Sequence, residues 1–271
     1  MKQRKRLAII GAGNIGSAIA NGLLDAKVYQ PDELTLTRKK HQLLEPFREK
    51  GCRTGQDNRE AIEASDIILI AVEPQQFDNL MNEIGDRFTD GSKLIISVVS
   101  GVSIRQIKSK VNEKTPVVRA MPNTAIAVRE SMTCIAARES DREGLDAARQ
   151  IFDTVGLSLV IAEEQMTAAT ALGACGIAFF LRAIRAASQG GIEIGFHSHD
   201  ALRIAAQTAK GASVLLQKMG KHPEYEVDNV TTPRGCTISG LNQMEHEGFS
   251  SAMIKGIVVS AEKAAKLYQN E

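Results

Sequence analysis

The sequence predicts an α/β protein with an N-terminal, Rossmann-type doubly wound sheet followed by an all-helical domain. Three observations support this fold class. Apolar strand-like runs alternate with helical patterns in the first half, a glycine-rich turn joins the first strand to the first helix, and strand signals almost vanish after residue 162. We therefore divide the chain into residues 1–162 and 163–271.

The first domain is built from short apolar runs, most of which end at Gly or Pro, and these predict strands. The runs are Leu7–Ile10, Glu33–Thr37, Ile67–Val72, Lys93–Val99, Pro116–Arg119, Met132–Ala136 and Leu157–Ile161. Helical spacing of apolar positions predicts helices over Ile15–Leu24, His41–Glu49, Phe77–Phe88 and Ile104–Val111. Because strand and helix alternate with short connections, we expect a parallel sheet with helices on both faces.

The second domain is rich in Ala, and we expect helices over Thr167–Ala187, Ala201–Met219 and Ser250–Gln269. Only 4% of the chain is aromatic and it contains no Trp, so these helices would form a thin core on their own. We therefore expect a second copy of the chain to complete the core, which makes the protein a homodimer. The apolar stretch Met166–Leu181 ends short of the roughly 18–20 residues that cross a bilayer, and it reads as a buried helix.

Composition excludes several function classes. The 271 residues carry 33 Lys and Arg against 32 Asp and Glu, so net charge does not indicate binding to nucleic acid or to a membrane. The four cysteines, Cys52, Cys134, Cys175 and Cys236, form no C-x-x-C pair and are too scattered for a disulfide framework. Glycines interrupt the apolar run that follows the basic N-terminus, which favours a strand over a signal peptide. We expect a cytoplasmic protein.

One histidine pair raises the question of a metal site. His197 and His199 are followed by Asp200, a spacing that could ligate a metal. A polar turn in which Asp200 or Ser198 caps the next helix explains the same residues. We favour the capped turn and expect no metal.

The turn after the first strand has the pattern G-x-G-x-x-G, from Gly11 to Gly16. Its position between a strand and a helix is the context in which this pattern binds a dinucleotide. Gly11 permits the tight turn, Gly13 lets a pyrophosphate approach the backbone, and Gly16 lets the helix pack on the strand. The phosphates would lie at the helix N-terminus, where unpaired N–H groups carry partial positive charge. Residues 1–162 are therefore expected to form a dinucleotide-binding domain.

The end of the second strand indicates which dinucleotide. An NAD site needs a carboxylate there for the ribose diol, but the strand ends in Thr37, Arg38, Lys39 and Lys40. A guanidinium such as that of Arg38 can bind a 2′-phosphate through two hydrogen bonds. We therefore expect NADP(H) to be favoured over NAD(H).

Two further segments combine unusual local chemistry. Arg119–Thr124 follows a strand, so it should lie at the carboxyl edge of the sheet, where ligands bind in open α/β folds. Asp228–Thr237 offers hydroxyls, an amide, Pro and Gly between two helices, and such a turn can direct N–H and Thr hydroxyl groups at one anion, such as a carboxylate. Each segment alone is also compatible with an ordinary capped turn.

Together these motifs resemble pyrroline-5-carboxylate reductase over almost the whole chain. The segments that carry the resemblance are Gly11–Gly16, Ala71–Gln75, Ser100–Ile104, Arg119–Thr124, Thr231–Thr237, Gly240–Leu241, Glu245 and Gly248–Phe249. The resemblance implies reduction of the ring imine of 1-pyrroline-5-carboxylate to L-proline with hydride from NAD(P)H, a step of proline biosynthesis. It also implies a dimer through the helical domain, 163–271, which helps form the substrate site, and a larger ring built from dimers.

The resemblance also implies site residues. Thr237 is expected beside the imine nitrogen as the catalytic residue. The expected substrate-binding residues are Glu163, Thr232, Gly235, Cys236 and Thr237. The expected cofactor-binding residues are Gly11, Gly13, Asn14, Ile15, Gly16, Thr37, Arg38, Asn58, Ala71, Val72, Pro74, Ser100, Met121, Pro122, Asn123 and Asn229.

The sequence departs from the family pattern at several of these places. Arg234 replaces a glycine of the Thr-rich loop, where a conformation with positive φ would be strained. Arg129 and Ser131 replace glycines after Arg119–Thr124, and Glu73 replaces a lysine near the cofactor. Two alternatives therefore stay open: a reductase of another cyclic imine or related small substrate, and a non-catalytic NADP-binding regulatory protein. A β-hydroxyacid dehydrogenase is disfavoured, because the long helix lacks the expected lysine after Gly173 or Gly176.

Overall fold

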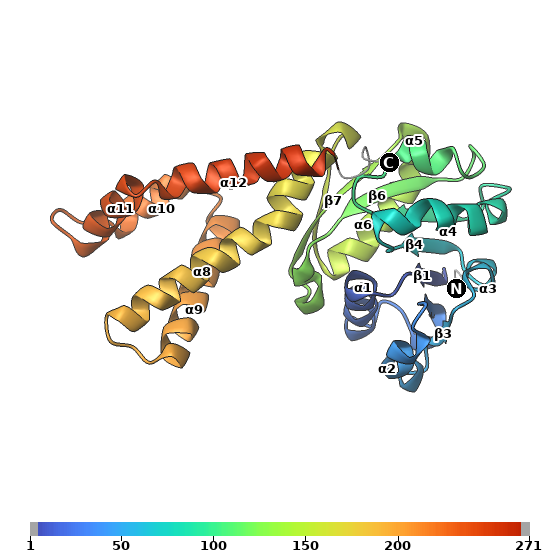
Figure 1. Ribbon diagram of the computed structural model, residues 1–271, viewed down its shortest axis with the longest axis horizontal. Helices are drawn as coiled ribbons and strands as arrows, with labels where there is room; N and C mark the ends of the chain where they lie inside the picture. Colours follow the sequence, from blue (N-terminus) through green and yellow to red (C-terminus); the bar gives the residue numbers. More distant parts are fainter. Residues whose placement is uncertain (1–4, 267–271) are drawn as a thin grey trace. The chain divides into compact units, whose positions relative to one another are not determined.

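The structure is a computed structural model that describes residues 5–266. Its N-terminal part contains one eight-stranded sheet with the strand order β3-β2-β1-β4-β5-β6-β7-β8 (Figure 1). The strands are β1 (Leu7–Ile10), β2 (Leu34–Thr37), β3 (Arg53–Gly55), β4 (Ile67–Ile70), β5 (Leu94–Ser97), β6 (Val117–Met121), β7 (Ser131–Ala137) and β8 (Gly156–Val160). The doubly wound order, which reverses between β1 and β4, confirms the predicted fold class.

The sheet is parallel except between β6 and β7, which run antiparallel with Arg119 opposite Ala136. The predicted parallel sheet is therefore confirmed for every pair of strands except this one. A parallel crossover needs about a dozen or more residues, and the short link from Met121 to Ser131 holds only a 3₁₀ turn, Thr124–Val128. The chain accordingly returns beside β6 in the opposite direction.

Helices cover both faces of the sheet because residues alternate between the two faces along each strand. In β1, Leu7 and Ile9 join one apolar cluster while Ala8 and Ile10 join the other. The first cluster is covered by α1 (Asn14–Asp25), α2 (Glu45–Glu49) and α6 (Arg142–Thr154). The second is covered by α3 (Asn58–Glu63), α4 (Phe77–Ile84) and α5 (Ile104–Lys108).

Three elements of this domain escaped the sequence analysis: β3, α3 and α6. The edge strand β3 has the sequence Arg-Thr-Gly and shows no apolar alternation. The buried residues of α6 include Gly144, Ala148, Ile151 and Phe152, and their helical spacing is the sequence signal that indicates this helix. The predicted helix over Phe77–Phe88 divides into α4 and a 3₁₀ turn, Gly85–Arg87.

A buried ion pair joins α5 to the start of α6. The ammonium of Lys108 lies 3.3 Å from Oδ2 of Asp141, and the two side chains are 3% and 5% exposed. Lys108 also donates to the carbonyl of Glu113 at 2.9 Å, and Asp141 accepts from the backbone N–H of Val117 at 3.2 Å. Both charges are therefore compensated away from water, and the pair connects the segments that flank β6.

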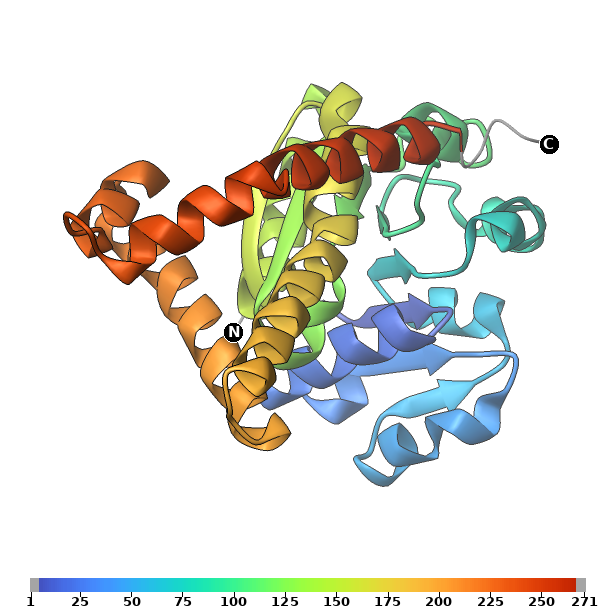
Figure 2. The ribbon, with the colours of Figure 1, turned by 60° about the vertical axis from the view of Figure 1, so that its left-hand side comes forward.

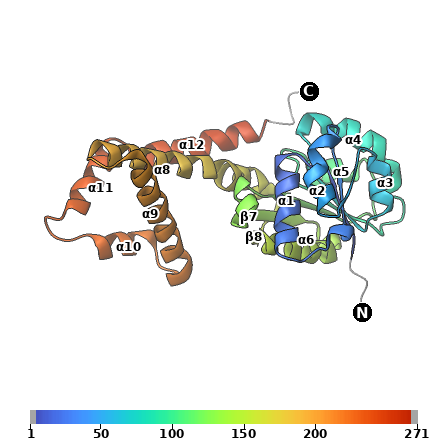
Figure 3. The same cartoon turned by 90° about the horizontal axis from the view of Figure 1, so that it is seen from below.

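The C-terminal part is helical, as predicted. It contains α7 (Met166–Ala169), a π-helical turn (Thr170–Cys175), α8 (Gly176–Glu193), α9 (Ser198–Met219), α10 (Pro223–Val230), α11 (Cys236–His246) and α12 (Phe249–Ala264). Helices α8 and α9 lie side by side, and the chain returns through α10 and α11 into α12 (Figures 2 and 3). The last residues of the helix predicted over Ser250–Gln269 lie outside the described part of the chain.

The helices fall mainly in a second compact unit, Gly176–Val259, whereas the described residues up to Cys175 and from Ser260 onward belong to the first. The boundary between 162 and 163 stays a prediction. Large apolar side chains of the second unit are exposed, among them Phe180, Leu181, Phe196, Ile204, Met219 and Ile254. This unit by itself therefore buries little apolar surface.

Two local predictions are wrong. The apolar stretch expected as a short buried helix is part of a helical run over Glu163–Glu193, which by length and composition alone could cross a membrane, and only 17% of its most apolar window is buried. At α9 the N-cap is His197, and among the described residues neither Ser198 nor Asp200 makes the expected cap, because the helix begins at Ser198 and includes both.

Candidate functional site

The glycine turn after β1 has the geometry that the sequence predicts. Gly11 has a φ of +86°, and a Cβ there would lie 2.6 Å from Cγ1 of Val72. A Cβ on Gly16 would lie 3.0 Å from Cγ2 of Ile9, so the helix approaches the strand closely. A Cβ on Gly13 would meet only the carbonyl oxygen of Gly11, at 3.9 Å, so the backbone of Gly13 is open to a ligand.

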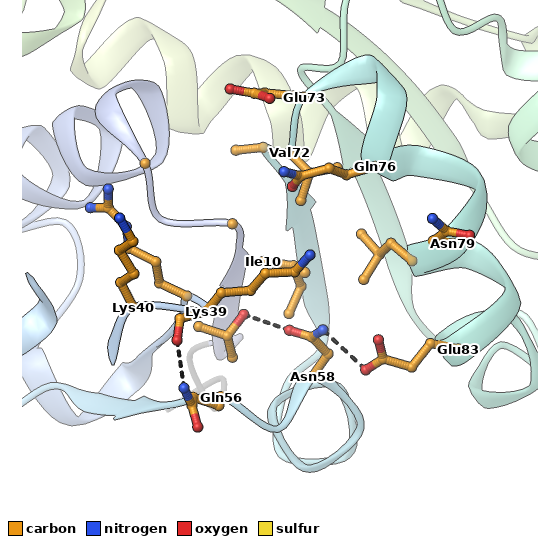
Figure 4. A pocket seen from close by; sticks show the side chains of 16 residues that line it. Ile10, Lys39, Lys40, Gln56, Asn58, Val72, Glu73, Gln76, Asn79 and Glu83 are labelled. Atoms are coloured by element: carbon orange, nitrogen blue, oxygen red, sulfur yellow. Dashed lines mark hydrogen bonds between the residues drawn. The ribbon is translucent and has the colours of Figure 1, made fainter. Parts of the chain in front are cut away.

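A pocket of about 330 Å³ lies beside this turn, at the carboxyl ends of β1, β2 and β4 (Figure 4). Seven predicted cofactor residues line it: Gly11, Gly13, Thr37, Arg38, Asn58, Ala71 and Val72. Nine lining residues were absent from the predicted cofactor set: Ile10, Lys39, Lys40, Gln56, Glu73, Gln76, Asn79, Leu80 and Glu83. The pocket therefore joins the glycine turn to the basic end of β2, as the spacing of these motifs predicts.

The basic end of β2 is held against the glycine turn. Nη1 of Arg38 donates to the carbonyl of Ala12 at 3.3 Å, and its backbone N–H donates to the carbonyl of Gly55 at 3.2 Å. Nε2 of Gln56 donates to the carbonyl of Lys39 at 2.5 Å. Arg38, Lys39 and Lys40 all line this pocket. Their positive charges favour an anionic ligand group there.

A chain of polar contacts crosses the floor of the pocket (Figure 4). Oγ1 of the buried Thr37 donates to Oδ1 of Asn58 at 2.7 Å, and Nδ2 of Asn58 donates to Oε1 of Glu83 at 3.1 Å. Gln76, Asn79, Leu80 and Glu83 follow helical spacing near and along α4. That spacing is the sequence signal that could have identified them, once β4 was known to end beside the glycine turn.

The predicted residues after β6 form a braced turn. Oδ1 of Asn123 accepts from the N–H of Ala125 at 3.0 Å, and its Nδ2 donates to the carbonyl of Gly173 at 3.2 Å. The hydroxyl of Ser131, which is buried, accepts from the N–H of Asn123 at 3.1 Å. Ser131 therefore gives this turn a hydrogen bond that a glycine there would not provide.

Glu163 forms an ion pair with Arg119, which lies in the middle of β6. Nη1 of Arg119 lies 3.0 Å from Oε1 of Glu163, and the same oxygen accepts from the N–H of Ile104 at 2.7 Å. Ile104 follows the Ser100 segment directly. Glu163 therefore contacts the last residue of the Ser100–Ile104 segment.

The Thr-rich loop lies in the second compact unit. The loop proper is Thr231–Gly235, since Asn229 is in α10 while Cys236 and Thr237 begin α11. The N–H of Gly235 donates to the carbonyl of Thr232 at 2.9 Å, and a Cβ on Gly235 would lie 2.5 Å from Oγ1 of Thr232. The backbone therefore makes a tight turn at Gly235. The unpaired N–H groups at the N-terminus of α11 and the hydroxyl of Thr237 directly follow this turn.

Arg234 has a φ of +63°, and Arg129 has a φ of +62°. Both occupy left-handed conformations at positions where the sequence analysis noted missing glycines. With Lys27 they are the non-glycine residues of the described chain that have positive φ. The expected strain at Arg234 is thus present in the backbone, whereas Ser131 continues an extended strand.

The structure does not bring all predicted site residues together. Asn14, Ile15, Gly16 and Pro74 are adjacent to the pocket in sequence but do not line it. Met121 ends β6, and Ser100, Pro122 and Asn123 lie on other loops of the first unit. Asn229, Thr232, Gly235, Cys236 and Thr237 belong to the second unit. Nδ2 of Asn229 is 3.4 Å from Oε2 of Glu226 on its own helix.

Comparisons with known proteins agree with this geometry. Residues 163–267 match the family model described as pyrroline-5-carboxylate reductase dimerisation, and residues 6–101 match one described as NADP oxidoreductase coenzyme F420-dependent. The chain is 46% identical to pyrroline-5-carboxylate reductase 2 of Dictyostelium discoideum, covering 98% of this chain and 94% of the relative. It is 52% identical to reductase 1 of the same organism, where it covers 97% of this chain but only 50% of the relative.

Solved structures give the same result. A pyrroline-5-carboxylate reductase from Coxiella burnetii superimposes with a TM-score of 0.90 at 27% identity, covering 98% of this chain and 99% of that one. The Plasmodium falciparum pyrroline carboxylate reductase with NADP bound gives a TM-score of 0.85 at 25% identity, covering 98% of each chain. The resemblance found in the sequence is therefore confirmed, and this chain belongs to the pyrroline-5-carboxylate reductase family.

Proposed function

We propose that this protein reduces 1-pyrroline-5-carboxylate to L-proline with NAD(P)H, an oxidoreductase step of proline biosynthesis that acts on a CH–NH bond. The observation that carries the proposal is the pocket that joins the glycine turn to the cationic end of β2, in a chain that belongs to this reductase family. A direct test mixes the protein with NADPH and the imine and follows the loss of NADPH absorbance. Tight NADPH binding without turnover would favour the non-catalytic alternative.

The residues of the chain are suited to positioning a reactive pair rather than to forming a covalent intermediate. The nicotinamide, when bound, supplies the hydride. A protonated imine is already electrophilic, so orientation of the substrate supplies much of the remaining acceleration. The hydroxyl of Thr237 hydrogen-bonds the ring nitrogen or relays its proton, and the turn with Thr232, Gly235 and Cys236 holds the substrate carboxylate. Glu163 is proposed as a further substrate-binding residue near that ring.

NADP(H) is the proposed preferred cofactor. Arg38, Lys39 and Lys40 border the pocket, and a 2′-phosphate beside them would gain charge-assisted hydrogen bonds that a free ribose hydroxyl would not. We expect Arg38→Ala to raise the KM for NADPH about tenfold while changing the KM for NADH less than twofold, because only NADPH carries that phosphate. Steady-state kinetics with both cofactors measure this, and equal effects on both would remove Arg38 from phosphate recognition.

Residues 163–271 are the proposed dimerisation domain, and dimers are proposed to assemble further into a ring. The exposed apolar side chains of α8, α9 and α12, such as Phe180, Ile204 and Ile254, are what a partner would cover. Light scattering on the intact chain tests this, and a monomer at micromolar concentration would contradict it. The cytoplasm is the proposed location.

Arg234 favours one alternative substrate class. Arg234 belongs to the loop proposed to hold the substrate carboxylate. Its backbone has a positive φ, a conformation that glycine adopts more readily. A larger cyclic imine with a second anionic group would gain a contact from its guanidinium. Comparing kcat/KM for a series of cyclic imines distinguishes this substrate class from pyrroline-5-carboxylate.

A further inference from the structure

Arg119 is a buried cation in the middle of β6. It lies opposite Ser97 of the neighbouring parallel strand β5, and its side chain is only 10% exposed. A buried guanidinium needs a partner, since the desolvation of an unpaired charge is very costly. Its partner comes from a distant part of the chain.

That partner is Glu163, at the start of the 3₁₀ turn Glu163–Gln165. Its Oε1 accepts from Nη1 of Arg119 at 3.0 Å and from the N–H of Ile104 at 2.7 Å. Ile104 is the first residue of α5, so the carboxylate satisfies an N–H that the helix itself leaves unpaired. Oε1 of Glu163, in the segment after β8, therefore contacts both β6 and the first residue of α5.

The hydrogen bond from Ile104 to Glu163 lies at the end of the loop that leads into α5. Val99 and Val102 are buried, whereas Ser100 and Gly101 between them are partly exposed, and Gly101 has a φ of +83°. The N–H of Ser103 donates to Oε1 of Gln106 at 2.8 Å, which sets the beginning of the helix. The loop 98–103 is therefore held by the buried side chains of Val99 and Val102 and by the cap at Ser103. The residue that follows the loop, Ile104, is held by its hydrogen bond to Glu163.

We propose that Arg119 and Glu163 are a positioning pair for loop 98–103, and that Glu163 acts on cofactor binding through the N–H of Ile104. This inference rests on the proposed function, because Ser100 in that loop is a proposed cofactor contact. Arg119 orients the carboxylate of Glu163, and the carboxylate orients the loop. Arg119 is a positioning residue in this scheme and need not touch the substrate.

The test compares Arg119→Met, Glu163→Gln and Glu163→Ala in the intact protein. NADPH affinity is measured by the fluorescence of the bound nicotinamide, and KM for the imine is measured separately. We expect Arg119→Met to weaken NADPH binding about fivefold, with imine KM changed less than twofold. Glu163→Gln, whose amide oxygen can still accept from Ile104, should be milder than Glu163→Ala.

Arg138→Met is the matched control, because it breaks an exposed ion pair with Glu113 whose side chains are 40% and 74% exposed. It should leave both NADPH affinity and imine KM unchanged. Hydrogen exchange supplies a measurement that does not depend on turnover. Glu163→Ala should speed amide exchange in residues 98–108 and leave β1 and α1 unchanged.

Two results would overturn the inference. The first is normal NADPH affinity in both Arg119→Met and Glu163→Ala, since the pair would then have no effect on cofactor binding. The second is unchanged exchange over residues 98–108 in Glu163→Ala. Failure of the proposed function is distinguishable from both, because the unmodified protein itself would then not reduce the imine.

Discussion

The buried pair of Lys108 and Asp141 predicts a large and specific loss of stability. Asp141→Asn removes the negative charge but keeps an oxygen that can accept from the N–H of Val117, so the main change is an ammonium left without its counter-charge at 3% exposure. Breaking a buried ion pair on one side costs about 3–5 kcal/mol. At roughly 2–4 °C per kcal/mol for a domain of this size, the melting temperature should fall by about 6–20 °C.

Thermal unfolding followed by circular dichroism measures this effect. Arg138→Met serves as the control, because its exposed pair should contribute at most about 1 kcal/mol. Lys108→Met combined with Asp141→Leu should recover much of the loss, since it leaves no buried charge. If Asp141→Asn melts within the range of the control, the pair does not carry the stability that its burial implies.

Three further predictions concern the Thr-rich loop and one buried tyrosine. Thr237→Ala should lower kcat by about tenfold to a hundredfold, as loss of one positioned hydroxyl does; Ser239→Ala on the same helix is the control, and unchanged turnover would exclude Thr237 from the mechanism. Arg234→Gly should raise the free energy of unfolding by up to about 1 kcal/mol, because it relieves a left-handed φ of +63° and the relief exceeds the entropic cost of glycine; a lower melting temperature would contradict this. Burial, together with the charges of Glu33 and Asp66, raises the pKa of Tyr29 from 10.0 to about 12. The stability it contributes is complete below pH 10 and is lost as pH rises toward 12, so Tyr29→Phe should flatten that alkaline decline, and equal slopes in both proteins would refute the shift.

The strands and the glycine turn could be predicted from the sequence because each depends on residues that are close together along the chain. Leu7–Ile10 is apolar on both faces, and Gly11 and Gly16 are required by contacts with Val72 and Ile9 that any strand-turn-helix of this kind makes. Arg38 could be predicted for a related reason: it directly follows β2, and a parallel strand next to β1 must end beside the same turn. The family resemblance extended this reading to most of the chain.

The missed elements depend on distant partners. The lining residues Gln76, Asn79 and Glu83 become part of the pocket only because β4 pairs with β1 and places α4 beside it. The antiparallel direction of β7 depends on the length of the link between β6 and β7 and on the register of the two strands. The spacing of apolar residues along the chain indicates neither. The contact of Glu163 with Ile104 joins positions far apart in sequence, so no local pattern could have identified it.

The fold class, the glycine turn, its cationic border and the family could all be inferred from the order of the residues. Apolar periodicity and glycine geometry act over a few residues, and they are therefore present in the one-dimensional pattern. Three features became visible in the folded chain alone: the hydrogen bond of Ser131 to Asn123, the left-handed backbone at Arg234, and the contact of Arg119 with Glu163 beside Ile104. Those outcomes depend on which chain segments come within hydrogen-bonding distance, and the packing of the whole sheet decides that.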